Sequence, residues 1–451
     1  MTRIMAQYVP LEMALLGLLE LALSFLFIYG MLTAPGVLTL LATASPYLTE
    51  NCTYLAVALT FTIAATAATI GLYRPEVCLD RRRLLTNATV TGLVAFPAIV
   101  LVSGGPRLSL SAQDVFWLAK MLSLWLVGLL FIRLLYGLVF SRGQAARRVL
   151  ILGDSPNGTR LIRHLGGKGP GLYEALSNRD NTMPLTVEAL RSQNIWGVVV
   201  AGGGGEIPLD QLRDSKLRGI RVFNEASFYE THLGRINLDT LNAQWFINAE
   251  GFSNGALLAA IKRLFDIAAS ATLLLLTLPL MLLVALMIRS DSPGPVLYRQ
   301  VRTGLFGKPF TLLKFRSMRL DAEAGGTAIW AQKRDPRITR TGNFIRSTRI
   351  DELPQLLNVL RGEMSMIGPR PERPVFVEEL AKVIPFYHER AYVKPGITGW
   401  AQVNFPYGAS VEDAREKLAY DLYYVKNHGL LLDLLIFVST IRVILFREGA
   451  R

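Results

Sequence analysis

The decisive stretch of this chain reads Arg346-Ser-Thr-Arg349-Ile-Asp351-Glu352-Leu-Pro354-Gln-Leu-Leu, and close behind it comes Met366-Ile-Gly368-Pro369-Arg370-Pro371-Glu372-Arg373. Two adjacent carboxylates stand among arginines and beside rigid proline turns. Pro354 has no N–H to donate, so a helix accepts it only in its first turn, and the leucines after it supply an apolar stripe. The pattern places Asp351 near the N-cap of this helix and Glu352 just inside it, where a helix end favours anions.

A helix cap with surface ion pairs would explain Asp351 and Glu352 equally well if they stood alone. The Gly368-Pro369-Arg370-Pro371 turn and the apolar surroundings favour a functional site instead. Phosphoryl transfer needs an anionic nucleophile or metal ligand, and fixed cations that hold phosphate charge. Arg370, held between two prolines, would offer a preorganised guanidinium for phosphate.

The composition indicates a membrane protein with substantial soluble parts. The chain has 451 residues, too many for one domain; 51% are hydrophobic and 18% charged, and its mean hydropathy is +0.33. The net charge of +13 comes without long Lys/Arg runs, so we expect anionic lipid and polyanionic substrates as partners, and no nucleic acid. Two cysteines and four scattered histidines favour neither a disulfide framework nor a Cys/His metal site.

Residues 1–145 are predicted to form a bundle of four membrane spans, at roughly 11–32, 54–73, 88–103 and 115–140. The first span reads as a retained anchor rather than a cleaved signal peptide. Basic residues gather in the second loop and after residue 141, whereas the first loop has none. By the positive-inside rule, the N-terminus and everything after Arg142 face the cytoplasm.

Residues 146–250 are predicted to form a Rossmann-like α/β domain, because strand patterns such as Arg148–Leu152 and Gly197–Ala201 alternate with helical ones. Gly153-x-Ser155-x-x-Gly158 is an imperfect dinucleotide fingerprint, with serine at the middle glycine. We favour a tight strand-to-helix turn in a structural or regulatory module, and nucleotide binding is the alternative.

A fifth apolar stretch, about 259–289, opens the third predicted domain, 251–451, and contains Pro279. A kinked membrane span is one interpretation. We favour a re-entrant helix that breaks at Pro279 and returns to the same face, because both of its flanks are basic. A soluble region, 291–428, follows it, and an apolar helix at 430–446 is expected to lie at the membrane interface.

Four motifs in this third domain carry a resemblance to a known family. They are Lys314-Phe-Arg316-Ser-Met318, Asp351-Glu352-Leu-Pro-Gln, Gly368-Pro-Arg370-Pro and Lys394-Pro-Gly-Ile-Thr398-Gly. Together they resemble the monotopic phosphoglycosyl transferases that begin bacterial exopolysaccharide assembly. The whole architecture is similar to the long form, the polyprenyl-phosphate hexose-1-phosphate transferases. Pro371-Glu-Arg-Pro and the segment 406–415 resemble the exosortase-linked (PEP-CTERM) subgroup.

The resemblance implies a two-step transfer of hexose-1-phosphate from a nucleotide-diphospho-sugar, by preference UDP-glucose or UDP-galactose, to undecaprenyl phosphate, with release of UMP. Asp351 would form the covalent aspartyl phospho-sugar, and Glu352, with or without Asp351, would hold Mg²⁺. The cationic and hydroxyl residues expected to bind phosphate or substrate are Lys314, Arg316, Arg346, Arg349, Arg370 and Thr398. Lys314 and Arg316 would share one face of a strand, and the Thr398 segment would be either a nucleotide loop or a packing turn.

The same resemblance implies a place in the bacterial inner membrane, with the catalytic domain on the cytoplasmic face. The lipid acceptor would arrive beside the re-entrant helix, since each CH₂ drawn out of the bilayer costs about 0.8 kcal/mol. The family often has Ser-Pro at the break, whereas Leu278 precedes Pro279 here. A homodimer could form through the middle domain or the C-terminal helix.

Three other functions are compatible with parts of the sequence. A membrane scaffold or nucleotide sensor would need Gly153 and Gly158 but not Asp351. A glycosyl transferase acting on a lipid-linked sugar would release nucleoside diphosphate rather than monophosphate. A transporter is disfavoured, because the predicted spans carry few polar groups and no detectable repeat.

Overall fold

The structure is a computed structural model that divides into two compact units, with the division between Phe228 and Tyr229. It describes residues 2–4, 7–9, 11–34, 52–70, 72–73, 81–104, 112–140, 147–153, 156–165, 173–178, 183–202, 208–249, 251–252, 255–319, 337–405, 408 and 410–446. Residues 35–51, 74–80, 105–111 and 141–146 lie outside the described ones, whereas Arg81–Arg83, counted with the predicted second loop, begin a helix. The predicted orientation of the spans therefore stays a prediction.

Four helices follow the short strands β1 (Thr2–Ile4) and β2 (Gln7–Val9). They are α1 (Leu11–Thr33), α4 (Cys52–Ile70), α6 (Arg81–Gly104) and α7 (Ala112–Phe140). They pack around a shared apolar core in which Leu59, Ile99 and Met121 are almost fully buried. The four helices coincide with the four predicted spans.

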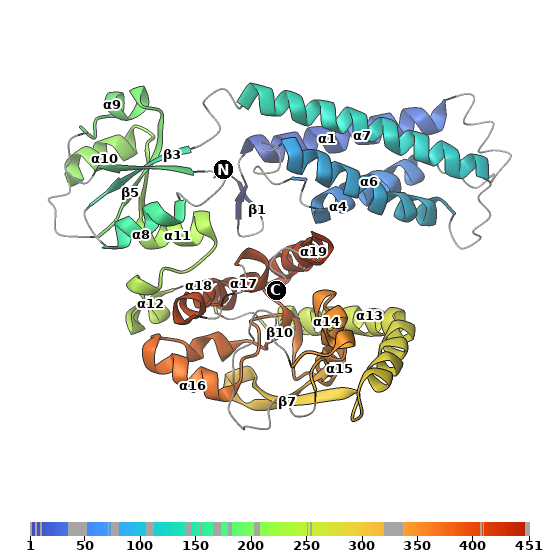
Figure 1. Cartoon of the computed structure of the whole chain (residues 1–451). Coiled ribbons are helices and arrows are strands. Elements are labelled where there is room, and N and C mark those ends of the chain that lie inside the picture. Colours follow the sequence, from blue (N-terminus) through green and yellow to red (C-terminus); the bar gives the residue numbers. More distant parts are fainter. Residues whose placement is uncertain are drawn as a thin grey trace. The chain divides into compact units, whose positions relative to one another are not determined.

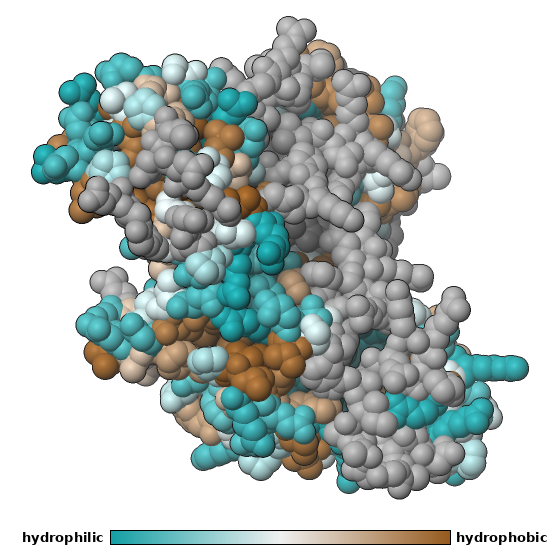
Figure 2. All heavy atoms as spheres, turned by 60° about the vertical axis from the view of Figure 1, so that its left-hand side comes forward, coloured by the Kyte–Doolittle hydropathy of each residue, from teal (hydrophilic) through white to brown (hydrophobic). Residues whose placement is uncertain are grey.

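Three helices of the described residues are long and apolar enough to cross a membrane: Leu15–Thr33 of α1, Val115–Tyr136 of α7, and α13 (Ala256–Asp291). The apolar parts of α4 and α6, Cys52–Ala68 and Leu84–Val100, are shorter. Large apolar side chains are exposed on these helices, and Figure 2 shows apolar patches beside hydrophilic ones on the face that it displays. Such surfaces fit a chain that meets both water and lipid.

The predicted α/β region contains a four-stranded parallel sheet in the order β4-β3-β5-β6. Figure 1 shows α9 and α10 on one side of this sheet and α8 and α11 on the other. The bounds are β3 (Arg147–Leu152), α8 (Pro156–Leu165), β4 (Tyr173–Asn178), α9 (Val187–Ser192), β5 (Ile195–Val200), α10 (Leu209–Leu217), β6 (Arg221–Asn224) and α11 (Glu225–Leu233). A doubly wound α/β sheet is therefore confirmed.

The Rossmann-like detail is not confirmed, because strand order 2-1-3-4 is the flavodoxin type and a Rossmann sheet runs 3-2-1-4. Gly153, the first glycine of the imperfect fingerprint, has φ +100°, and a Cβ there would lie 2.2 Å from the Ala201 carbonyl oxygen. This close approach of two strand ends explains the glycine without a ligand. Asp154 and Ser155 lie outside the described residues.

The second unit begins at Tyr229, whereas the predicted third domain begins at residue 251. Its elements before residue 350 are η2 (Leu238–Thr240), α12 (Ala243–Asn248), α13, β7 (Leu297–Thr303), η3 (Leu305–Gly307), β8 (Pro309–Phe315) and α14 (Arg340–Ser347). Residues 229–249 pack within this unit: the Ile236 side chain is buried in its core, and Trp400 Nε1 donates to the Gly234 carbonyl at 2.6 Å.

The remaining elements are η5 (Ile350–Glu352), α15 (Gln355–Arg361), β9 (Ser365–Ile367), α16 (Pro374–Val383), η6 (His388–Tyr392), β10 (Gly396–Thr398), α17 (Trp400–Asn404), α18 (Val411–Asn427) and α19 (Leu430–Phe446). β7 and β8 form an antiparallel pair, and β9 and β10 a parallel one. The core joins α15 and β9 to α17 and α18, with Val359, Ile367 and Leu422 fully buried. The apolar helix predicted at 430–446 is present as α19.

Helix α13 is 36 residues long, contains Pro279, and bends in Figure 1 (yellow). Proline removes one hydrogen bond of the helix ladder, and the Thr277 hydroxyl donates to the Leu273 carbonyl at 2.7 Å, a bond that also favours bending. Side chains around the bend are exposed and apolar; Leu275 is 73% and Leu276 71% accessible.

Both ends of α13 attach to the same compact unit. Near its start, Arg263 donates to the carbonyls of Val359 and Leu360 at 2.7 and 2.8 Å. Near its end, Val284 and Ile288 pack in one apolar cluster with Phe315 and Ile345. A straight helix of this length would extend about 54 Å, so the bend is what lets both ends reach one domain.

Candidate active site

Asp351 and Glu352 lie in the 3-10 turn η5, one turn before the helix that the sequence places around them. Arg349 precedes them in the left-handed conformation, with φ +60°. The N–H of Glu352 bonds the Arg349 carbonyl at 3.2 Å, and α15 begins only after Pro354. The predicted N-cap position of Asp351 is therefore corrected: i→i+3 bonding tightens the chain ahead of the proline. Both carboxylates are 8% accessible.

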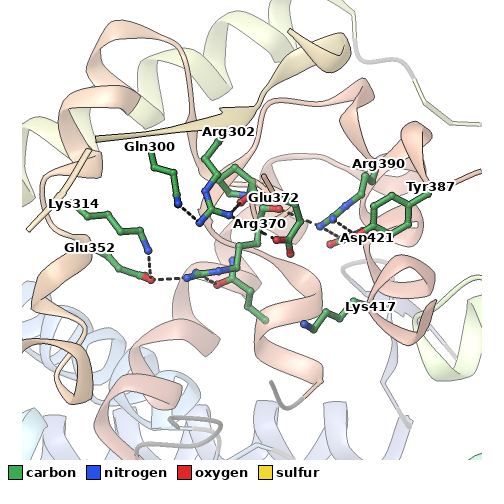
Figure 3. Close-up of polar contacts among 12 residues, drawn as sticks. Gln300, Arg302, Lys314, Glu352, Arg370, Glu372, Tyr387, Arg390, Lys417 and Asp421 are labelled. Atoms are coloured by element: carbon green, nitrogen blue, oxygen red, sulfur yellow. Dashed lines mark hydrogen bonds and ion pairs between the residues drawn. The ribbon is translucent and has the colours of Figure 1, made fainter. Parts of the chain in front are cut away.

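Three cations converge on a single oxygen of Glu352. Its Oε1 accepts a hydrogen bond from Arg370 at 2.7 Å and lies 3.4 Å from Lys314 Nζ and 3.7 Å from an Arg349 nitrogen. Burial alone would raise the pKa of the Glu352 carboxyl, but Arg370, Lys314 and Arg349 together hold this pKa well below its usual range. Figure 3 shows Lys314 and Arg370 reaching the Glu352 carboxylate from two sides.

Asp351 differs from its neighbour in both contacts and basicity. Among the described residues, none forms a hydrogen bond or ion pair with its carboxylate. Burial and the charge of Glu352 raise the pKa of Asp351, while Lys314, Arg370 and Arg346 lower it less strongly. The pair therefore consists of one neutralised carboxylate and one with open, more basic oxygens.

The turn that carries Arg370 is fixed by backbone hydrogen bonds to the facing segment. The Gly368 N–H donates to the Thr398 carbonyl, and the Gly396 N–H donates to the Pro369 carbonyl, each at 2.9 Å. A Cβ on Gly368 or Gly396 would lie 2.1–2.2 Å from backbone atoms of the facing segment. Only glycine permits this approach, so close packing explains the glycine of the Gly368–Pro371 motif and that of the Lys394–Gly399 motif.

Behind the turn lies a buried ion pair that the sequence did not single out. Arg390 donates to Asp421 at 2.7 Å, to the Tyr387 hydroxyl at 2.8 Å and to the Arg370 carbonyl at 3.1 Å. On the other side, Arg302 donates to the Pro371 carbonyl at 3.1 Å. Figure 3 shows the Arg370 side chain between Glu352 and this group. These residues come from distant segments without a local motif, so only the fold reveals them.

Gln402 was also missed by sequence reasoning. Its Oε1 accepts from Arg370 at 3.2 Å, and its Nε2 donates to the Ile397 carbonyl. It stands two residues beyond Trp400, so its closeness to the Lys394–Gly399 motif was the available signal. The structure brings Asp351, Glu352, Lys314, Arg349 and Arg370 together, and Arg346 is near enough to lower the pKa of Asp351.

Two predicted residues take other places. Arg316 donates to the carbonyls of Ser292 and Pro293 at 2.7 and 2.9 Å, and so binds the C-terminal end of α13 rather than the Glu352 group. The strand β8 ends at Phe315, so the expected shared face of Lys314 and Arg316 is not maintained. The Thr398 hydroxyl lies 2.6 Å from that of Thr440 in α19, a packing contact, and the choice between a nucleotide loop and a packing turn stays a prediction.

The site leaves carboxylate oxygens open on Asp351 and Glu352. No group of three His, Cys, Asp or Glu side chains that could hold a metal occurs within the described residues. All three cations near Glu352 contact Oε1, so Oε2 and the Asp351 oxygens are available. Mg²⁺ commonly takes one or two carboxylates and completes its shell with water and substrate phosphates.

The fold and the site define a membrane-associated protein with a cation-rich carboxylate pair, suited to handling phosphate. Residues 257–447 match the family model described as bacterial sugar transferase. A UDP-glucose:undecaprenyl-phosphate glucose-1-phosphate transferase of Escherichia coli is 32% identical over 329 residues, covering 69% of this chain and 70% of that protein. The chain belongs to the bacterial sugar transferase family.

Two further relatives have different names. A UDP-N-acetylgalactosamine-undecaprenyl-phosphate N-acetylgalactosaminephosphotransferase of Aeromonas hydrophila is 46% identical over 235 residues. This match covers 52% of the chain and about half, 55%, of the relative's length. An exopolysaccharide production protein PSS of Rhizobium leguminosarum is 45% identical over 190 residues, covering 40% of the chain and 93% of that protein. The exosortase-linked subgroup stays a prediction.

Proposed function

We propose that this protein transfers hexose-1-phosphate from a UDP-hexose to undecaprenyl phosphate and so begins exopolysaccharide assembly. The observation that carries the proposal is the division of charge between Asp351 and Glu352. One carboxylate is neutralised by three cations, and the other has open oxygens beside them. The relatives' names supply the chemical class, and UDP-glucose is the first donor to test.

In the first step an Asp351 carboxylate oxygen attacks the β-phosphorus of the donor. The bond from this phosphorus to the bridging oxygen breaks, and UMP leaves with that oxygen and the electron pair. In the second step a phosphate oxygen of the lipid attacks the same phosphorus. The bond to Asp351 breaks, the carboxylate is restored, and the lipid carries a diphospho-hexose. Each step is a displacement at phosphorus that needs positioning and charge stabilisation.

The other side chains act by electrostatics and position. Arg370 and Lys314, fixed by Glu352, would stabilise the negative charge that spreads over the phosphate oxygens. Glu352, with or without Asp351, would hold Mg²⁺, which when bound neutralises pyrophosphate charge. Arg390 positions the Arg370 backbone and touches no reacting atom in this mechanism.

We also propose that α13 is re-entrant, so that the active site lies on the cytoplasmic face of the bacterial inner membrane. Its bend at Pro279, its exposed apolar middle and the attachment of both ends to one unit support this placement. A helix that crossed the membrane straight would place its two ends on opposite faces. We further propose that the first unit has four membrane spans and that the protein forms a homodimer.

The test uses the full-length protein in nanodiscs with Mg²⁺, undecaprenyl phosphate, and UDP-glucose, UDP-galactose or UDP-N-acetylgalactosamine. We expect lipid-dependent UMP release that is lost in Asp351→Asn and on chelation of Mg²⁺ with EDTA. Asp210→Asn is the matched control, because Asp210 is an exposed aspartate of α10 in the other unit. Release of UDP would indicate a glycosyl transferase. Release of neither nucleotide from folded protein would contradict the proposal and favour a scaffold.

A further inference from the structure

A cavity of about 320 Å³ opens beside Arg370 in the second unit. Its walls are the turn Pro369–Glu372, the short helix η6 and the turn at η3. Arg370 belongs to both the carboxylate site and the cavity, because its guanidinium donates a hydrogen bond to Glu352 and the residue also lines the cavity. A molecule whose phosphate lies at Arg370 could therefore extend into this cavity.

The cavity wall combines aromatic rings with a few polar groups. Phe306 and Tyr392 meet edge to face with centroids 5.9 Å apart, and they are 64% and 60% accessible. Tyr387 and His388 add further rings, and Pro369 and Pro395 are rigid apolar wall residues. Such a lining suits a flat aromatic ligand that is oriented by few hydrogen bonds.

The backbone holds Phe306 in an unusual conformation. Its φ is +53°, which non-glycine residues rarely adopt, and it lies in the turn between β7 and β8. A large apolar side chain that is both strained and accessible stabilises the free protein little. Strain at an exposed position is expected where the side chain serves a ligand.

All the residues that line the cavity come from elements other than α13 and α19, the apolar helices of this unit. The lipid acceptor must approach along the membrane, whereas the nucleotide is the water-soluble part of the donor and leaves into water. The cavity is therefore better placed for the nucleoside than for the lipid.

Resting on the proposed function, we infer that this cavity is the subsite for the pyrimidine nucleoside of the donor, with Phe306 and Tyr392 stacking on the base. The pyrophosphate then passes Arg370, and its β-phosphate reaches Asp351. The hexose lies on the Asp351 side of Arg370, outside the cavity. No new bond is made or broken in this assignment.

The first test measures UMP binding to the full-length protein in nanodiscs by calorimetry. We expect Phe306→Ala and Tyr392→Ala each to weaken UMP binding by about 5- to 100-fold, since loss of base stacking has an effect of this size. In turnover, the KM for the UDP-hexose should rise while kcat changes little. Phe344→Ala is the matched control, because Phe344 is an exposed aromatic residue of α14 that does not line the cavity.

A second measurement needs no variant. Wild-type protein is photo-crosslinked with 4-thiouridine monophosphate, and the modified peptide is mapped; we expect it within residues 303–307 or 387–393. Crosslinks elsewhere, or unchanged UMP affinity in both variants of a protein that releases UMP, would overturn the subsite and leave the proposed function standing. A weaker affinity for glucose-1-phosphate instead of UMP would make the cavity a sugar subsite and also overturn it. Failure of the wild type to release UMP would contradict the function itself.

Discussion

At the scale of single residues, Asp351 and Glu352 are neighbours in sequence with opposite surroundings. Glu352 forms the anionic centre for Arg370, Lys314 and Arg349, whereas Asp351 has no such set. Burial and the charge of Glu352 raise the pKa of Asp351, and an ionised carboxylate with open oxygens is a better nucleophile than one saturated by cations. The proposal that Asp351 is the nucleophile therefore has a physical argument beside the family likeness.

Substitution of the two carboxylates should affect stability in opposite ways. Glu352→Gln leaves three cations facing a neutral amide, and loss of one partner of a buried ion pair costs about 3–5 kcal/mol. Asp351→Asn removes a carboxylate beside another carboxylate and should leave the Tm unchanged or higher. Thermal unfolding of the two variants in the same detergent tests this. A lower Tm for Asp351→Asn than for Glu352→Gln would contradict the division of charge.

Arg346 provides a test of the Asp351 pKa. The charge of Arg346 lowers this pKa, so Arg346→Gln should raise it further. UMP release requires ionised Asp351, and its rate should fall as the pH drops through the pKa. The acid limb of the pH–rate profile should therefore move to higher pH in Arg346→Gln.

Arg361→Gln is a control with the same change of charge, because Arg361 is not among the groups that shift the pKa of Asp351. An acid limb that stays in place in Arg346→Gln would argue against Asp351 as the titrating group.

The two carboxylates contribute to the pH dependence of folding stability with opposite sign. Glu352 stabilises the folded state above its unfolded pKa, and this contribution is lost as the pH falls below about 4.5. Asp351, with its raised pKa, is less favourable to folding once ionised.

The sequence predicted much of this site, because motifs that carry charged residues recur within a short stretch. Lys314, Arg349 and Arg370 do meet Glu352. Arg316 was expected to share a strand face with Lys314, but strand periodicity holds only inside a strand, and β8 ends one residue before Arg316. Arg390 and Asp421 form their pair across 31 residues, and no local pattern indicates such a contact.

At the scale of elements, the sequence left open whether α13 crosses the membrane or returns to the same face. Its apolar length allowed either a span or a re-entrant helix, since length alone does not fix direction. In the structure Arg263 near its start and Ile288 near its end pack on the same unit, and this observation supports the re-entrant proposal. Strands β3 and β5 were easier to predict, because a buried parallel strand is a continuous apolar run, whereas β4 and β6 lack such a run and were not predicted.

The re-entrant path of α13 can be tested by cysteine labelling. In a chain with Cys52 and Cys78 replaced by serine, Gly255→Cys and Ser290→Cys should react with a membrane-impermeant maleimide in vesicles of the same orientation. Both positions are exposed at the two ends of the helix. Leu278→Cys, beside the break, should resist labelling in either orientation. Labelling of the two ends from opposite sides would show that α13 crosses the membrane.

At the scale of the whole molecule, the division between Phe228 and Tyr229 predicts where the chain can be shortened. A chain that begins at Glu225 keeps α11 and the segment 229–249, and should fold and release UMP. A chain that begins at residue 251 loses the buried Ile236 and the bond from Trp400 to Gly234. We expect it to be less stable, as measured by limited proteolysis and thermal unfolding.

The full-length variant Ile236→Ala tests the contribution of Ile236 packing to stability separately from the truncation. Truncation of a buried isoleucine costs about 2–5 kcal/mol, so its Tm should fall without a change in the KM for the donor. Val411→Ala, at an exposed aliphatic position of α18, should have little effect. Equal stability of the two shortened chains would contradict the packing of residues 229–249 on this unit.

The position of Asp351 has a consequence for how such a protein evolves. Its carboxylate is buried beside another carboxylate and its pKa is raised, so its ionisation does not favour the folded state. A lineage released from selection for activity should therefore lose this aspartate early, while the glycines that bring β9 and β10 together stay. Laboratory evolution for thermostability alone should follow the same course and enrich well-folded, inactive descendants.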